Sequence, residues 1–234
     1  MKLESIISFY DRESPEATEF RRLYSNIRGL DGNLKTVMIT SSMVEEGKSL
    51  ISSFLALTIA ENTRQKILLL DSDLRRPMIN VLFKLPLENG LSDLLEGKSK
   101  IPDLMKTTPV PELKIITAGK VTGSPTGILN PIKLHEVFDE LKFYFDYIVV
   151  DAPPVIPVSD PLIIANEVDG VLMVVRAGST PKEVVKRAVN LLNNSKVRVL
   201  GTVLNNIEEV LPYYYSSKYY SYKYYHKEQA KSHN

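Results

Sequence analysis

The fold is decided by the stretch Met38-Ile39-Thr40-Ser41-Ser42-Met43-Val44-Glu45-Glu46-Gly47-Lys48-Ser49. A short apolar strand runs into a polar turn, and the turn ends in Gly47-Lys48-Ser49 before a helical pattern begins. Backbone N–H groups in such a turn, together with the positive end of the following helix, form a binding site for an anion. This order of elements predicts a phosphate-binding loop.

The residue types in this loop predict a nucleotide site. Lys48 would reach the β- and γ-phosphates, and the Ser49 hydroxyl would be a ligand of Mg²⁺. Ser42 stands where the usual pattern has a glycine, six residues before the lysine. Gly-Lys-Ser is common by chance, so this stretch alone does not establish nucleotide binding. The predicted nucleotide-binding residues are Ser42, Glu46, Gly47, Lys48 and Ser49.

Strands and helices alternate along the rest of the chain. The predicted strands cover 36–40, 66–71, 113–117, 147–151, 171–175 and 197–204. The predicted helices cover 15–28, 48–62, 90–97, 129–143 and 180–194. Most strands are continuous apolar runs, which indicates burial on both faces. We therefore expect an α/β fold with a doubly wound, mostly parallel sheet and helices on both faces, as in the P-loop NTPases.

The sequence predicts a single domain preceded by an N-terminal segment and followed by a tail. Residues 1–35 hold a loose arm (1–13) and a helix that starts at Ser14-Pro15, with serine as cap and proline at the first helical position. Residues 36–210 form the phosphate-loop domain, and a capping box at Thr180-Pro181-Lys182-Glu183 opens its last helix. Residues 211–234 lack apolar periodicity and are expected to be a flexible tail. Eight of the twelve tyrosines lie in this tail: Tyr213, Tyr214, Tyr215, Tyr219, Tyr220, Tyr222, Tyr224 and Tyr225.

Composition excludes several classes of protein. Of the 234 residues, 24% are charged with a net charge of +1, which argues against a nucleic-acid-binding protein. The chain has no cysteine, so disulfides and thiolate metal sites are excluded. The N-terminus lacks the features of a signal peptide, and no run of about 18 apolar residues predicts a membrane span. We expect a cytoplasmic protein that a partner would recruit to the inner face of the membrane.

Acidic residues follow two of the buried strands. Asp71 and Asp73 come at and just after one strand end, and Asp151 closes another before Ala152-Pro153-Pro154. Ligands of parallel sheets bind at the carboxyl ends of the strands, so these side chains belong at the edge that carries the phosphate loop. Carboxylates there need a cationic partner, either Mg²⁺ on a nucleotide or a nearby arginine. Each motif alone also fits a solvated or turn-capping aspartate, whereas all three in order favour nucleotide binding.

Taken together, these elements resemble the bacterial tyrosine kinases, the capsule and exopolysaccharide autokinases. The resemblance covers about Ser14 to Tyr225 and rests on the phosphate loop, the Asp-x-Asp-x-Arg motif, the apolar-Asp-x-Pro-Pro motif and the tyrosine cluster. The matching residues are Thr40, Ser41, Ser42, Glu46, Gly47, Lys48, Ser49, Asp71, Asp73, Arg75, Asp151, Pro153 and Pro154. It implies ATP- and Mg²⁺-dependent autophosphorylation of the tail tyrosines between subunits of a homo-oligomer. It also implies a transmembrane activator (a polysaccharide co-polymerase chain) and a protein-tyrosine phosphatase.

With this resemblance, the chemistry of phosphoryl transfer assigns roles to six residues. Lys48 would neutralise the transferring phosphate, and Asp73 and Asp151 would organise Mg²⁺ together with Ser49. Asp71 is the candidate acceptor of the tyrosine proton, because free tyrosine has a pKa near 10. Arg75 would steady the triphosphate or a neighbouring subunit.

Two other functions stay open. A ParA/MinD-like ATPase switch shares this fold, although it would carry a second lysine where Met43 stands. A nucleotide-poor scaffold phosphorylated by another kinase is the other, because Glu45 replaces a family glycine beside the triphosphate site. The family's N-terminal oligomer motif falls on Thr18, Arg21 and Tyr24, where only Arg21 matches. The sequence identifies neither the polysaccharide nor the activator nor the number of subunits.

Overall fold

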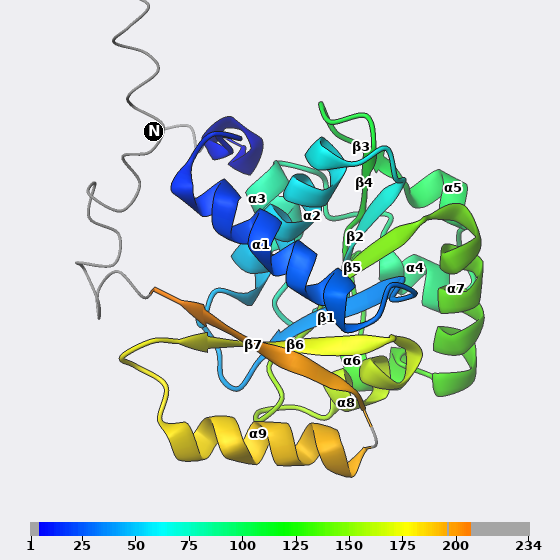
Figure 1. The fold of residues 1–234 in the computed structure, drawn as a ribbon. Helices are drawn as coiled ribbons and strands as arrows, with labels where there is room; N and C mark the ends of the chain where they lie inside the picture. The colour runs from blue at the N-terminus through cyan, green and yellow to red at the C-terminus, as the bar shows by residue number, and fades with distance from the viewer. Residues whose placement is uncertain (1–4, 196, 207–234) are drawn as a thin grey trace, which may run out of the picture.

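A seven-stranded sheet organises the chain in the computed structural model, which describes residues 5–195 and 197–206 (Figure 1). The strands are β1 (Thr36–Ser41), β2 (Ile67–Asp71), β3 (Lys106–Thr107), β4 (Leu113–Ile116), β5 (Tyr147–Asp151), β6 (Gly170–Arg176) and β7 (Val199–Asn205). Their order is β3-β4-β2-β5-β1-β6-β7, and all neighbours are parallel except β3 and β4. The predicted doubly wound, mostly parallel sheet is confirmed.

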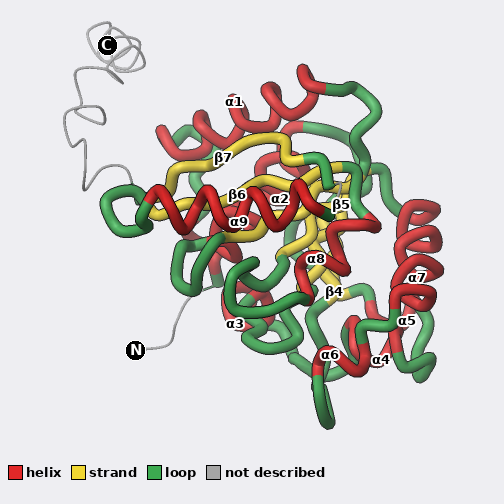
Figure 2. The backbone as a smooth tube through the Cα atoms, turned by 90° about the horizontal axis from the view of Figure 1, so that it is seen from below, coloured by secondary structure: helices red, strands yellow, loops and turns green. Residues whose placement is uncertain are grey.

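Side-chain alternation along the strands builds a separate hydrophobic core on each face. In β1, Val37 and Ile39 face one core while Met38 faces the other. The first core lies under η1 (Ile6–Phe9), α1 (Pro15–Leu30), α2 (Lys48–Asn62) and α3 (Ile79–Phe83). The second lies under α4 (Leu91–Leu95), α5 (Ile101–Leu104), α6 (Pro125–Ile128), α7 (Pro131–Tyr144), α8 (Asp160–Ile164), η2 (Ala165–Glu167) and α9 (Lys182–Asn194). Figures 1 and 2 show the two layers of helices with the sheet between them.

The register of the central strands brings the predicted site together. Asp71 at the end of β2 pairs with Asp151 at the end of β5, and Asp151 pairs with Ile39 of β1. The phosphate loop leaves β1 at the same edge. Local sequence places each acidic residue at a strand end, and the strand order makes those ends neighbours.

Two local expectations are wrong. Residues 5–13 are not a loose arm, because Ile6 is buried and the Tyr10 hydroxyl donates to Thr58 Oγ1 over 3.0 Å. No capping box opens α9, whose N-cap is Pro181 without a side-chain cap, since the Thr180 hydroxyl donates instead to the Glu46 carboxylate. The predicted cap of α1 is confirmed, with Ser14 Oγ accepting from the Ala17 N–H over 3.0 Å.

The N-terminal helix packs as part of this domain. Ala17, Tyr24 and Ile27 of α1 are buried, and the Tyr24 hydroxyl donates to Gln65 Oε1 over 2.9 Å. Arg21 donates to the Arg12 carbonyl and to Thr18 Oγ1 within the same segment. The tyrosine cluster lies outside the described residues. Within the described ranges, the helices are all too short or too polar to cross a membrane.

Candidate nucleotide site

The phosphate loop joins β1 to α2 and depends on one glycine. Gly47 is the N-cap of α2 and has a φ of 90°, in the left-handed region that favours glycine. A Cβ at this position would collide with Nδ2 of Asn205, the last residue of β7. That amide nitrogen donates to the Glu46 carbonyl over 2.9 Å. Gly47 therefore lets the loop approach β7 closely while it points the start of α2 at the site.

Two neighbouring glutamates shape the loop in different ways. Glu45 is exposed and has a φ of 63°, a conformation that costs a non-glycine residue about 1–2 kcal/mol. Glu46 is buried, and its carboxylate accepts from the Met43 N–H over 2.7 Å and from the Thr180 hydroxyl. The Glu46 side chain thus ties the loop to the segment between β6 and α9. Only the backbone of Glu46 therefore remains available to a nucleotide.

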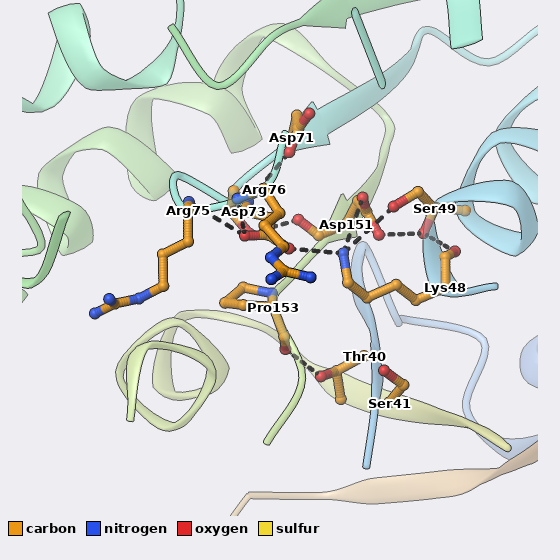
Figure 3. Close-up of polar contacts among 12 residues, drawn as sticks. Thr40, Ser41, Lys48, Ser49, Asp71, Asp73, Arg75, Arg76, Asp151 and Pro153 are labelled. Atoms are coloured by element: carbon orange, nitrogen blue, oxygen red, sulfur yellow. Dashed lines mark hydrogen bonds and ion pairs between the residues drawn. The ribbon is translucent and has the colours of Figure 1, made fainter. Parts of the chain in front are cut away.

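Ser42 also contributes to the loop from inside the fold. Its side chain is fully buried, and its hydroxyl lies 3.9 Å from Met173 Sδ. The Ser42 carbonyl accepts from the Ile156 N–H over 3.2 Å. Of the predicted nucleotide-binding side chains, Lys48 and Ser49 are directed toward the acidic strand ends (Figure 3). The side chains of Ser42 and Glu46 are held within the protein.

Lys48 lies at the centre of the site (Figure 3). Its Nζ is 2.9 Å from Asp73 Oδ2, 3.6 Å from Asp151 Oδ2 and 3.3 Å from Ser49 Oγ. Asp151 Oδ1 accepts from the Ser52 hydroxyl over 3.1 Å, whereas its buried Oδ2 has no hydrogen bond, because the ion pair to Lys48 is too long to be one. The carboxylates of Asp73 and Asp151 are both almost completely buried.

Burial and charge shift the pKa values in opposite directions here. Burial lowers the pKa of Lys48, but the charges of Asp151 and Asp73 outweigh it, and the pKa is raised. Burial raises the pKa of Asp151 despite the opposing effects of Lys48 and Ser49. The pKa of Asp71 is raised well above its usual value, first by burial and then by the charge of Asp151. The site therefore holds more negative charge than one lysine relieves.

Asp71 is directed away from Lys48, into the loop that follows β2 (Figure 3). Its two carboxylate oxygens accept from the backbone N–H groups of Asp73 and Ile79, each over 3.1 Å. The side chain is fully buried. Asp71 thus fixes the backbone that presents Asp73 to Lys48.

Arg75 has a partner that the sequence did not indicate. Its guanidinium donates from Nε to Asp160 Oδ2 over 2.7 Å and from Nη2 to Asp160 Oδ1 over 3.1 Å. Nη2 also donates to Thr126 Oγ1 over 2.6 Å. Ser159-Asp160-Pro161 is typical of a helix start, so no local signal marks Asp160 as a partner of Arg75. The roles of Asn205 and Thr180 were also not predicted. Both residues contact Glu46 of the phosphate loop, which is far from them in the sequence.

The available oxygens suit a magnesium ion that is bound together with phosphate. Among the described residues, no group of three or more histidine, aspartate or glutamate side chains converges as a metal site. Mg²⁺ is usually held by one or two carboxylates plus substrate phosphates, rather than by a cage of protein ligands. Asp73, Asp151 and the Ser49 hydroxyl are a donor set of that kind, and the unbonded Asp151 Oδ2 is consistent with it.

Comparisons with known proteins show what the chain is similar to. A family model described as ParA, NUBPL iron-transfer P-loop NTPase, matches residues 34–234. The chain is 34% identical over 221 residues to the putative tyrosine-protein kinase CapB of Staphylococcus aureus, covering 92% of this chain and 96% of that protein. It is 30% identical over 203 residues to the tyrosine-protein kinase YwqD of Bacillus subtilis, covering 86% of this chain and 85% of that protein.

Solved structures show the same likeness. The crystal structure of the chimerical protein CapA2B2 superposes with a TM-score of 0.81 at 30% identity, covering 88% of this chain and 91% of that one. The septum site-determining protein MinD of Pyrococcus horikoshii, complexed with Mg-ADP, superposes with a TM-score of 0.63 at 22% identity, covering 73% of this chain and 70% of that one. The second likeness shows a shared fold alone.

Proposed function

We propose how this chain works from one premise: it belongs to the bacterial tyrosine-protein kinases, on a P-loop NTPase fold of the ParA type. The reaction is transfer of the γ-phosphoryl group of ATP to tyrosines of the chain's own C-terminal segment. The observation that carries the proposal is the position of Lys48 Nζ, 2.9 Å from Asp73 Oδ2 and 3.6 Å from Asp151 Oδ2, at the start of α2.

The chain's own groups bind and orient the phosphates. Backbone N–H groups around Gly47 receive the phosphates at the positive end of α2. Lys48 exchanges part of its contact with Asp73 and Asp151 for contact with the β- and γ-phosphates. Asp73, Asp151 and Ser49 would hold Mg²⁺, which when bound neutralises phosphate charge. Glu46 and Asn205 keep the loop in its binding shape through their contacts within the protein.

In the transfer, the tyrosine oxygen forms a bond to the γ-phosphorus, and the bond from that phosphorus to the β–γ bridging oxygen breaks. ADP leaves with the electron pair, and the proton of the tyrosine hydroxyl goes to a carboxylate. Asp71 is our candidate acceptor, because its raised pKa makes it more basic than an ordinary aspartate. Its carboxylate is enclosed by the loop 72–78, so this role requires that loop to open.

Arg75 takes part in the proposal through its pair with Asp160. That pair anchors the loop of Asp71 and Asp73 to α8, and Thr126 links it to α6. The pair thereby positions Asp73 for Lys48. The acceptor tyrosines are those of the cluster from Tyr213 to Tyr225, outside the described residues.

The biological setting follows from the family as part of the proposal. The chain would act in the cytoplasm, at the inner face of the membrane, with a transmembrane activator of the polysaccharide co-polymerase kind. It would form a homo-oligomer, so that one subunit phosphorylates the tyrosines of another, and a protein-tyrosine phosphatase would reverse the reaction. Phosphates on several tyrosines add about −1.5 to −2 charge each, which suits a switch in capsule or exopolysaccharide synthesis.

One experiment tests the proposal. The purified chain is incubated with Mg-ATP, with and without a candidate activator, and phosphotyrosine is mapped by mass spectrometry. Lys48→Met and a variant with the eight tail tyrosines changed to phenylalanine serve as controls. We expect phosphotyrosine between Tyr213 and Tyr225 that is lost in both variants. ATP hydrolysis without phosphotyrosine would favour an ATPase switch, and the absence of both activities would favour a scaffold.

A further inference from the structure

The side chains of two neighbouring arginines after Asp73 diverge (Figure 3). The Arg75 side chain runs away from Lys48, toward its partners Asp160 and Thr126. The Arg76 side chain runs back toward the side of the loop where Lys48 and Asp151 lie. The motif that identifies this loop contains Arg75, so the sequence draws attention to the arginine that is already paired.

Arg76 is fixed close to the site by its backbone. Its N–H donates over 2.9 Å to Asp73 Oδ1, while Oδ2 of the same carboxylate receives Lys48 Nζ over 2.9 Å. The Arg76 residue is exposed, and within residues 5–195 and 197–206 its guanidinium has no hydrogen bond or ion pair. A cationic group is therefore anchored one carboxylate away from Lys48 and remains available to a ligand.

The charge of the site calls for such a group. Asp73 and Asp151 face a single committed cation, Lys48, since Arg75 is paired with Asp160. A nucleoside triphosphate adds several further negative charges. Catalysis of phosphoryl transfer consists mostly of positioning and neutralising that charge, and a planar guanidinium suits two phosphate oxygens at once.

We propose that Arg76 is a further catalytic residue, which contacts the phosphoryl group that is transferred, whereas Arg75 positions the loop through Asp160. This inference rests on the proposed function and deepens it. In Figure 3, Asp73 and Arg76 lie on one side of Lys48 Nζ, and Ser49 at the start of α2 lies on the other. A group on that loop therefore meets the terminal end of a triphosphate whose other phosphates lie on α2, so the γ-phosphate is the expected partner.

The test compares Arg76→Ala with Arg76→Lys and with Arg187→Ala, an exposed arginine on α9 that serves as the matched control. Calorimetry measures the affinity of each full-length chain for Mg-ADP and for a Mg-bound, non-hydrolysable ATP analogue. Initial rates of phosphotyrosine formation and thermal unfolding without nucleotide are measured in parallel.

For Arg76→Ala we expect the affinity for the ATP analogue to fall about 10-fold or more, with a change below about 3-fold for Mg-ADP, because one charge-assisted contact is lost. The phosphorylation rate should fall about 100-fold, which is typical when one positioned donor is removed. Arg76→Lys should recover part of both effects, and Arg187→Ala should match the wild type. The unfolding temperature should not change, since the Arg76 side chain is exposed.

An ATP-analogue affinity of Arg76→Ala within about twofold of the wild type would overturn the inference. Equal losses for the two nucleotides, or a loss that comes with a lower unfolding temperature, would also overturn it, because Arg76 would then support the fold or the diphosphate. If the wild type forms no phosphotyrosine, the proposed function fails by itself, and the ratio of the two affinities still decides the contact of Arg76.

Discussion

The phosphate loop has two sides that are built differently. On the side of β6 and β7, Glu46 accepts from Met43 and Thr180, and Asn205 donates to the Glu46 carbonyl. On the side of β2 and β5, Lys48 meets buried carboxylates, and Asp151 Oδ2 has no hydrogen bond. Satisfied polar groups stabilise a fold, whereas buried charge without full compensation destabilises it. The first side therefore maintains the shape of the loop, and the second is the side that a ligand would complete in the proposed function.

The largest effect on stability is expected from Gly47→Ala, on the side of the loop that faces β6 and β7. The alanine would have to adopt a left-handed backbone conformation, and its Cβ would displace the Asn205 amide. The free energy of unfolding should therefore fall by about 2–3 kcal/mol. Gly97→Ala is a matched control, because Gly97 has a φ of 70° and a Cβ added there would have nothing within 4 Å. Denaturant titration of both variants separates the effect of the Asn205 contact from that of the backbone conformation. Equal losses of stability in the two variants would show that the Asn205 contact has no effect.

Glu46→Gln should destabilise the same side more moderately. The glutamine has one oxygen for the three donors to Glu46, which are the Met43 N–H, the Thr180 hydroxyl and the Arg176 N–H, and its amide group adds a donor where an acceptor was. We expect a loss of about 1–2 kcal/mol in the free energy of unfolding, the size of one hydrogen bond to a charged group. Glu140→Gln on the exposed face of α7 is the control. Stability equal to the wild type would show that Glu46 does not maintain the loop.

Asp71→Asn tests the charged side through pH. Because the folded pKa of Asp71 is raised, its contribution to stability is fully present below the unfolded pKa and is lost as pH rises through the folded pKa. Without nucleotide, the unfolding temperature of the wild type should thus rise relative to that of Asp71→Asn as the pH falls from 7 toward 4. A difference between the two proteins that stays constant with pH would contradict the raised pKa.

Glu45→Gly should have the smallest effect, and in the opposite direction. Glycine removes the cost of the left-handed backbone but loses more conformational entropy on folding, so we expect a net stabilisation of about 0.5–1 kcal/mol. It also removes a negative charge beside the phosphate site, and Mg-ATP should therefore bind more tightly. Glu45→Gln removes the charge but keeps the backbone cost, so it should improve calorimetric affinity without stabilising the protein. Unchanged affinity in both variants would rule out the charge effect.

Much of the fold could be predicted because the strands are apolar runs bounded by turns. The helix 48–62 and the strand 147–151 were predicted with the bounds that the structure has. The short elements α3, α5, α6 and α8 were not predicted. With four or five residues each, they carry too few positions to show a helical period, and their conformation depends on what they pack against.

The candidate site could be predicted as a set of positions, but the direction of each side chain could not. The sequence determined that Lys48, Asp73 and Asp151 stand at a loop and at strand ends, because apolar periodicity and turn chemistry are local properties. The tertiary structure decided that Glu46 turns toward Thr180, that Arg75 pairs with Asp160, and that Arg76 is left to face the site. Glu46 and Thr180 are 134 residues apart, and Arg75 and Asp160 are 85 apart. Such pairs form only when the strand order β2-β5-β1-β6-β7 brings their loops to one edge of the sheet, because hydrogen bonds and ion pairs act over a few ångströms.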